Sequence, residues 1–396
     1  MTQTSLGFEK VCRSLSDLTL TAQIEQACQS RAMLSGEDLS ELLIRADEPV
    51  DFYPDTFQKR QLDLLSKVGS MVIDPVPEGQ TNGASSNSFN AATKIKMSPL
   101  SGAGLFRIGE SGRLYLITKS EHYHAPLGHS FPGYALIERA RGLGITNATH
   151  NNTRGWITRL LEERLVCEAN GLDWADKSGL ERVLGSEDPN VLNRVLNLET
   201  GSLAAEAALK MILARFYRPQ EGSETPKFEG KIPVLLVVGN DEGGPHANYH
   251  GTTFLTQTMR GMWPEFESRM ELGNLLKVHP IRPNNSADLD AAFQEFDKGD
   301  FKIAGFFHEI IMMNFGARLL TKEFLHKAYD LCREHDVPTV VDEIQSCMWA
   351  PGFFLFKEYG LKPSFLALGK GFSGGEYPAS RILFSSAFDN LPQFGA

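Results

Sequence analysis

Two short apolar runs, each followed by a charged side chain, constrain this chain more than any other feature. The first run covers residues 339–341 and is followed by Asp342. The second covers residues 364–368 and leads through a glycine to Lys370. Runs of this length and composition are typical of buried strands. Ligands bind at the carboxyl edge of the strands in open α/β sheets, so we expect Asp342 and Lys370 to lie together at such an edge.

Apolar strands alternate with helical patterns through the second half of the chain. Strands are predicted at residues 232–238, 275–281, 303–307 and 339–342. Helices are predicted at residues 202–217, after 286 and at 321–335. This alternation indicates βαβ units and predicts an α/β fold with a largely parallel sheet.

The first 190 residues have a different texture. Residues 1–75 show helix-like spacing of apolar side chains and predict a helical N-terminal extension. Residues 76–100 begin with a Pro-, Gly-, Ser- and Asn-rich stretch and predict a linker. Residues 101–190 form an N-terminal segment in which a β-hairpin is expected near its start. The main α/β domain is expected at residues 191–396.

The composition is that of an ordinary globular enzyme. Of the 396 residues, 42% are hydrophobic and 22% are charged, and the net charge of −10 argues against nucleic acid as a partner. No apolar run reaches the roughly 18–20 residues that span a bilayer, and the N-terminus lacks the pattern of a secretory signal. The five cysteines are scattered without a CxxC pair. We therefore expect a cytoplasmic protein with no membrane partner.

A small turn opens the Ala-rich helix expected after residue 202. Thr200, Gly201 and Ser202 stand at its start. The free N–H groups and the positive dipole end of such a helix can bind a phosphate, and the two hydroxyl groups can add hydrogen bonds. The alternative is an ordinary N-capped helix.

An aromatic residue and a histidine follow the predicted strand 232–238. Tyr249 and His250 precede Gly251 in a Gly-rich loop, where the tyrosine can stack on a flat heteroaromatic ring. Packing of a loop tyrosine on the surface is the alternative. His246 and His250 are four residues apart, but no third ligand falls in register, so no metal site is expected.

Four polar side chains complete the candidate chemistry. Glu309 follows the strand 303–307 and is either a group that tunes the site or an edge acid. Asp342 would be costly to bury without a partner, which can be a protonated pyridine nitrogen or an arginine. Gln345 can donate to a phenolic oxygen. Lys370 is either a desolvated nucleophile or a lysine that reaches solvent. Together they predict a pyridoxal phosphate site in which the lysine forms the Schiff base.

These motifs resemble those of the class III pyridoxal-phosphate-dependent aminotransferases, the group of ω-amino acid and related transaminases. The similarity begins near Gly104 and continues to the end of the chain. It rests on residues 127–132, 200–208, 249–251, 309, 342–345, 368–371, 374 and 375.

The resemblance implies a three-layer α/β/α large domain that binds pyridoxal phosphate and works as a homodimer. It implies an aminotransferase that moves an amino group between an amino acid or ω-amine donor and a keto acid or aldehyde. It assigns the catalytic roles to Lys370 and Asp342. The cofactor-binding residues that it implies are Thr200, Gly201, Ser202, Tyr249, His250, Glu309, Asp342, Gln345 and Lys370.

The sequence departs from the family pattern near the expected substrate. Leu203 stands where the family usually has Glu, Ile310 where it usually has Pro, and residues 347–352 replace a loop that contains Gly, Arg and Thr. Only 396 − 370 = 26 residues follow Lys370, whereas the family continues into a C-terminal small domain. We therefore expect a fragment or a shortened form, and the substrate stays open.

Two other functions are compatible with these residues. One is a different pyridoxal phosphate chemistry on the same fold, such as that of a mutase, racemase or decarboxylase. The other is a catalytically impaired protein of this fold with a binding or assembly role, which the altered loops and the short C-terminal part suggest.

Overall fold

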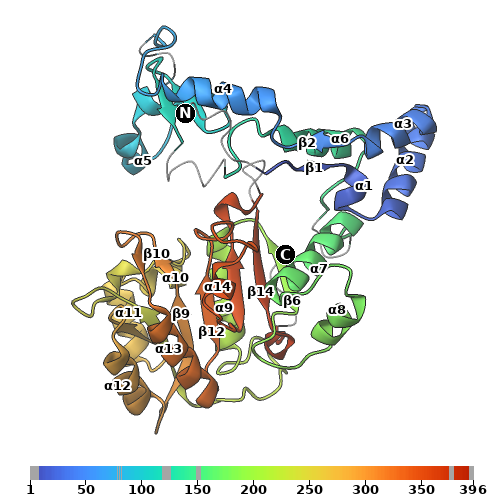
Figure 1. The fold of residues 1–396 in the computed structure, drawn as a ribbon. Helices are drawn as coiled ribbons and strands as arrows, with labels where there is room; N and C mark the ends of the chain where they lie inside the picture. Colours follow the sequence, from blue (N-terminus) through green and yellow to red (C-terminus); the bar gives the residue numbers. More distant parts are fainter. Residues whose placement is uncertain are drawn as a thin grey trace. The chain divides into compact units, whose positions relative to one another are not determined.

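The chain forms two compact units, Met1–Leu160 and Leu161–Ala396, in a computed structural model (Figure 1). The structure describes residues 9–77, 79, 81, 83–117, 126–148, 153–373 and 379–391.

A seven-stranded sheet organises the second unit. Its strands, in order across the sheet, are β6 (Arg194–Leu198), β14 (Ser380–Phe384), β13 (Phe365–Leu368), β12 (Thr339–Asp342), β9 (Phe301–His308), β7 (Ile232–Val238) and β8 (Lys277–Ile281). β14 is antiparallel to both of its neighbours, and all other neighbouring strands are parallel. The sheet is therefore mixed and mostly parallel, which confirms the predicted fold class.

Helices cover both faces of this sheet. Val234, Leu236 and Val238 point into one apolar core, and Leu235 and Val237 point into the other, because successive side chains of a strand face opposite ways. The first core is closed by α7 (Trp156–Ala169), α12 (Ser286–Phe296), α13 (Lys322–Glu334) and α14 (Leu355–Glu358). The second is closed by α9 (Gly201–Leu213) and α11 (Pro264–Leu272). Buried apolar layers on both faces explain why these strands read as continuous apolar runs.

Side-chain caps set where the main helices begin. Thr200, Asn285 and Thr321 accept hydrogen bonds from the first-turn N–H groups of α9, α12 and α13. Each such cap contributes about 1 kcal/mol. The remaining α-helices and strands of this unit are α8 (Lys177–Leu184), α10 (Phe254–Thr258), β10 (Ile311–Met312) and β11 (Arg318–Leu319). Among the helices of the described residues, none combines the length and the apolar character that a membrane-spanning segment requires.

The first unit has a helical part and a small antiparallel sheet. Its helical part holds β1 (Cys12–Arg13), α1 (Leu15–Leu18), α2 (Thr21–Ser35), α3 (Leu39–Asp47), β2 (Val50–Asp51) and α6 (Ala135–Gly142). The core of that part is formed by Leu15, Ile24, Cys28, Leu42, Ala46, Leu136 and Leu143. The sheet consists of β3 (Pro99–Ala103), β4 (Phe106–Gly109) and β5 (Leu114–Leu116), and the unit also contains α4 (Asp55–Leu65) and α5 (Asn87–Ala92). β4 and β5 form the hairpin that the sequence indicates.

Candidate active site

Five parallel strands bring the sequence-predicted site residues to one edge of the sheet. β6, β13, β12, β9 and β7 all end at this edge, because β14 is antiparallel to both β13 and β6. Asp342 is the last residue of β12, Glu309 follows β9, and Lys370 lies two residues after β13. The turn at Gly201 follows β6, and the loop that contains His250 follows β7. All nine predicted residues therefore lie in the segments that leave this edge.

The centre of the edge is a buried pair between Asp342 and His250. The Nδ1 atom of His250 lies 2.9 Å from Oδ2 of Asp342, and the residues are only 1% and 4% exposed. The Ile344 backbone N–H donates to the other carboxylate oxygen at 3.0 Å. The Nε2 atom of His250 is buried without a hydrogen-bond partner in the described part of the chain. The sequence placed both residues at the site but did not predict this pairing.

The surroundings of Asp342 fit a cationic ring nitrogen. The ionisable side chain that the structure places against this carboxylate is the His250 imidazole. A buried carboxylate is costly unless it is paired. The protonated nitrogen of pyridoxal phosphate is a group of the required charge, so the residues that are present fit this cofactor.

Lys370 is held in an unusual backbone conformation beside Tyr249. Its φ of 48° lies in the left-handed region, at the start of the short 3₁₀ turn Lys370–Ser373. Residues other than glycine rarely adopt this region, and it costs about 1–3 kcal/mol when the surrounding structure enforces it. The lysine is half-buried, and its Nζ atom lies 5.8 Å from the centre of the Tyr249 ring.

The beginning of α9 forms a solvent-facing group of hydroxyls. Thr200 Oγ1 accepts the Ser202 N–H at 3.1 Å. Ser202 Oγ in turn accepts the backbone N–H of Thr252 at 3.0 Å and lies 3.2 Å from its hydroxyl. Such a helix start, with its positive dipole end and its exposed hydroxyls, is suited to a phosphate group.

Glycines allow this helix start to approach the edge closely. A Cβ atom on Gly201 would lie 2.6, 2.8 and 2.9 Å from three atoms of the Ile344 side chain. One on Gly251, which has a φ of 132°, would lie 2.8 Å from Ser202 Cα. Gly369, directly before Lys370, also packs against Gly201 and Ile344. The turn at the start of α9 and the 3₁₀ turn that begins at Lys370, called the lysine turn below, are thus in contact through Gly201 and Gly369, which have no side chains.

Gln345 and Glu309 form a second buried polar contact. Gln345 Nε2 donates to Glu309 Oε1 at 3.4 Å, and both residues are buried. Next to them in the chain, His308 bonds through Nε2 to the Tyr329 hydroxyl at 2.9 Å. Burial lowers the pKa of His308 to about 3, so this imidazole is neutral.

Two neighbours of the site were not identified from the sequence. Thr252 bonds to Ser202, and the guanidinium of Arg260 lies 4.9 Å from the Tyr249 ring centre. The hydroxyl directly after Gly251 was the available signal for Thr252, whereas nothing in the sequence links Arg260 to the tyrosine. Gly374 and Gly375, part of the family-like motif, lie outside the described residues.

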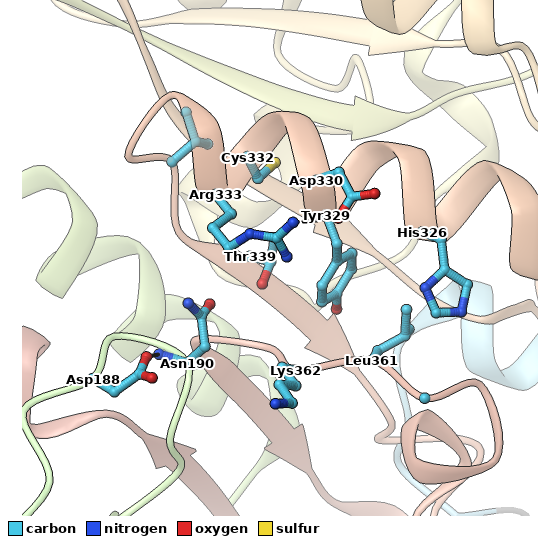
Figure 2. Close-up of a pocket in the computed structure, with 12 residues that line it drawn as sticks. Asp188, Asn190, His326, Tyr329, Asp330, Cys332, Arg333, Thr339, Leu361 and Lys362 are labelled. Atoms are coloured by element: carbon cyan, nitrogen blue, oxygen red, sulfur yellow. Dashed lines mark hydrogen bonds and ion pairs between the residues drawn. The ribbon is translucent and has the colours of Figure 1, made fainter.

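A separate pocket of about 310 Å³ opens at the other end of β12 (Figure 2). It is lined by Thr339, the first residue of the strand, by Tyr329, Cys332 and Arg333 of α13, and by Lys362. A strand rises about 3.3 Å per residue, so Thr339 lies about 10 Å along β12 from Asp342. The pocket is therefore distinct from the candidate active site.

Comparison with protein families gives one match. The model of the family described as "Aminotransferase class-III" matches residues 157–395, which is 239 of 396 residues. This range contains every residue of the candidate active site.

Curated relatives are similar over about 70% of the chain. An acetylornithine aminotransferase of Aquifex aeolicus is 26% identical over 302 residues, which cover 74% of this chain and 66% of the relative. An ornithine aminotransferase of Schizosaccharomyces pombe is 30% identical over 287 residues, which cover 69% and 56%. The chain thus spans 56–66% of the length of these two relatives.

Solved structures share the fold. An aminotransferase from Vibrio fluvialis in a PMP-bound form aligns with a TM-score of 0.57 at 17% identity, covering 80% of this chain and 69% of that one. An N-acetylornithine aminotransferase from Stenotrophomonas maltophilia aligns with a TM-score of 0.51 at 21% identity, covering 76% and 65%.

The contact between Gly201 and Ile344 gives a first prediction. Gly201→Ala should lower the free energy of unfolding by about 1–3 kcal/mol, because the added methyl overlaps three atoms of one side chain. Gly185→Ala is the control, since its nearest neighbour would be at an ordinary 3.4 Å. Urea unfolding measures both. The further change Ile344→Ala should cost less in Gly201→Ala than in wild type, and equal costs would contradict the proposed overlap.

Proposed function

The chain belongs to the class-III aminotransferase family, and from this premise we propose that it is, or is part of, a pyridoxal-phosphate-dependent aminotransferase. The proposed reaction moves an amino group from an amino acid or ω-amine donor to a keto acid or aldehyde. The observation that carries the proposal involves two consecutive residues. Tyr249 faces the amine of Lys370, and His250 holds the carboxylate of Asp342. A nucleophilic amine and a buried acid are thus tied to one segment at the carboxyl edge of the sheet.

The residues that would hold the cofactor follow from this arrangement. Thr200, Gly201 and Ser202 would bind its phosphate at the start of α9, and Tyr249 would flank its ring. Asp342 would bind the ring nitrogen. Pyridoxal phosphate supplies, when bound, an electron-withdrawing ring that accepts the electron pair left when a substrate carbon loses its proton.

The protein groups have separate tasks in such a reaction. Lys370 Nζ would hold the cofactor, and as a free amine it would take a proton from the substrate carbon and deliver it to the cofactor. Asp342 would face the ring nitrogen, and His250 fixes the orientation of its side chain through their 2.9 Å contact. Gln345 and Glu309 would lie on the side of the ring that carries the phenolic oxygen. The hydrogen bond between their side chains would fix the orientation of both.

The substrate class of this proposal is drawn from the relatives. The curated relatives bear the names acetylornithine aminotransferase, ornithine aminotransferase and diaminobutyrate–2-oxoglutarate transaminase. We therefore propose a donor that carries an amino group at the end of a short chain, with a keto acid as acceptor. A screen of ornithine, acetylornithine and diaminobutyrate with 2-oxoglutarate is the direct test.

Cofactor attachment provides the decisive prediction. Purified protein incubated with pyridoxal phosphate should become yellow, and borohydride should then fix the cofactor on Lys370, as peptide mass spectrometry would detect. Lys370→Ala should lose both the colour and the label. Lys362→Ala, a change at an exposed lysine, should keep both. A colourless but folded protein, or a label on another residue, would refute the proposed function.

The acid gives an independent prediction. Asp342→Asn should lower the rate of amino transfer by about 100-fold or more, because a neutral amide cannot hold a proton on the ring nitrogen. The rate is measured in a single turnover with an excess of the amine donor that the screen identifies. Asp330→Asn on the exposed side of α13 is the control and should leave the rate unchanged. A rate within threefold of wild type in Asp342→Asn would show that this carboxylate does not act on the ring.

We also propose that the protein is a cytoplasmic homodimer. The dimer is supported by an exposed aromatic cluster just after the His250 loop, where the Phe254 ring centre lies 5.1 Å from that of Trp263 and 4.6 Å from that of Phe266. These side chains are 39–51% exposed. The cytoplasmic location is supported by the five cysteines, which are free thiols.

Light scattering after size exclusion tests the dimer. The mass should be about twice the 43.9 kDa of the chain, and Phe266→Asp should shift it toward the monomer because a charge would be placed in an apolar contact. A monomer at all concentrations up to about 100 μM, far above the dissociation constants usual for stable dimers, would contradict the proposal.

A further inference from the structure

The loop between Gln345 and α14 is strained. Met348 and Phe353 have φ angles of 73° and 72°, in the left-handed region that side chains other than glycine rarely adopt. The loop folds on itself, since the Met348 N–H donates to the Phe353 carbonyl at 2.8 Å. Such conformations cost free energy and persist only where the surrounding structure enforces them.

One residue, Glu343, holds this loop at both ends. Its backbone carbonyl accepts the N–H of Cys347 at 2.9 Å at the start of the loop. Its side chain accepts the N–H of Leu355 at 2.9 Å and that of Phe356 at 2.6 Å, in the first turn of α14. The residue is fully buried, so these bonds are shielded from water.

The loop in turn packs against the lysine turn. Cys347 Sγ lies 3.8 Å from the carbonyl oxygen of Gly369, the residue before Lys370. The Phe353 ring meets the Phe372 ring of the same turn edge to face, with centres 5.9 Å apart. Both turns thus contain left-handed residues and support each other.

We propose that Glu343 is a positioning residue that clasps residues 346–354 and thereby holds the Lys370 turn in its left-handed conformation. The inference rests on the proposed function only for the role of the lysine. The clasp itself is a property of the chain. It adds to the site a buried acid that contacts neither of the expected reacting groups and acts through the loop.

The clasp has a defined response to pH. Burial raises the pKa of Glu343 to about 7, the Leu355 and Phe356 N–H groups lower it, and the neighbouring Asp342 raises it. The other titratable groups near it are Cys347 of the loop, whose pKa burial raises to about 12, and Tyr329 of α13, whose hydroxyl bonds to His308.

The sign of this response follows from the raised pKa. An open loop would expose Glu343 to water, where an ordinary Glu has a pKa of about 4.3. Closing the loop therefore takes up a proton at pH values between these two pKa values. The closed form is most favoured at low pH, and opening becomes easier as the pH rises to about 7.

Hydrogen exchange of the cofactor-free full chain tests the clasp. Leu355→Pro removes one donated N–H at the first position of a helix, where proline is tolerated. Phe354, with φ −114° and ψ 125°, already has the conformation that precedes proline. The opening equilibrium at Cys347 and Phe356 should rise about tenfold relative to Leu355→Ala, which keeps the N–H and loses the same side chain. Exchange in α13 should stay unchanged. If the exchange rates at Cys347 and Phe356 differ by less than twofold between Leu355→Pro and Leu355→Ala, the proposed clasp is wrong.

The pH dependence identifies the acid. In wild type, loop opening corrected for intrinsic exchange rates should increase from pH 5 to pH 8, and in Glu343→Gln it should be independent of pH. Glu358→Gln, at an exposed position on the same α14, should behave as wild type. A pH dependence that survives in Glu343→Gln would show that another group is responsible and would overturn the assignment.

The link to the lysine has its own readout. With pyridoxal phosphate bound, Leu355→Pro should shift the visible absorption of the Lys370-bound cofactor, or its pH midpoint, relative to Leu355→Ala. Identical spectra would remove the positioning role. If borohydride labels no lysine while the exchange results hold, the clasp stands and the proposed function fails, so the two failures are distinguishable.

Discussion

The buried carboxylate of Asp342 is the constraint on which the rest of the site depends. Removing a carboxylate from water costs several kcal/mol unless charge and hydrogen bonds replace the lost hydration. Here β12 is flanked by parallel strands on both sides, so the acid at its end cannot reach bulk solvent. Its protein partners are the Ile344 N–H and the His250 imidazole. The loop after β7 must therefore return across β9 to bring His250 to the acid, and this return also brings Tyr249 to Lys370.

Close backbone packing is the second requirement. The turn before α9 and the turn after β13 belong to segments about 170 residues apart, yet Gly201 and Gly369 are in contact. This contact lets the positive end of a helix and an amine lie within one small site. It is possible only because neither position has a side chain. The site thus has two requirements. Its buried polar centre needs hydrogen-bond partners, and the close contact between its two backbone turns needs glycines.

The sequence predicted the strands and the edge better than the contacts at that edge. β7 was predicted at its observed bounds because a run of apolar and β-branched residues can only be buried on both faces. The shared edge of Asp342 and Lys370 followed from the parallel pairing of β12 and β13. The pairing of His250 with Asp342 could not be predicted, because it depends on the path of a loop without periodic structure. The same holds for Thr252 and Arg260, which reach the site only through the conformation of that loop.

Glu343 has a structural role that the sequence motif alone does not indicate. In the sequence it is one of two residues between Asp342 and Gln345, and in the structure it is fully buried, with its backbone N–H donating to the Ala367 carbonyl of β13. Asp342 and Glu343 are consecutive, and side chains of consecutive residues in extended chain point to opposite faces. One acid therefore meets the His250 side of the sheet, and the other meets α14 and the loop at residues 346–354. Under the proposed function, the divergent part of that loop would lie next to the substrate. The two ends of the loop would then be held from within by Glu343, so that the residues between them could change without moving the ends.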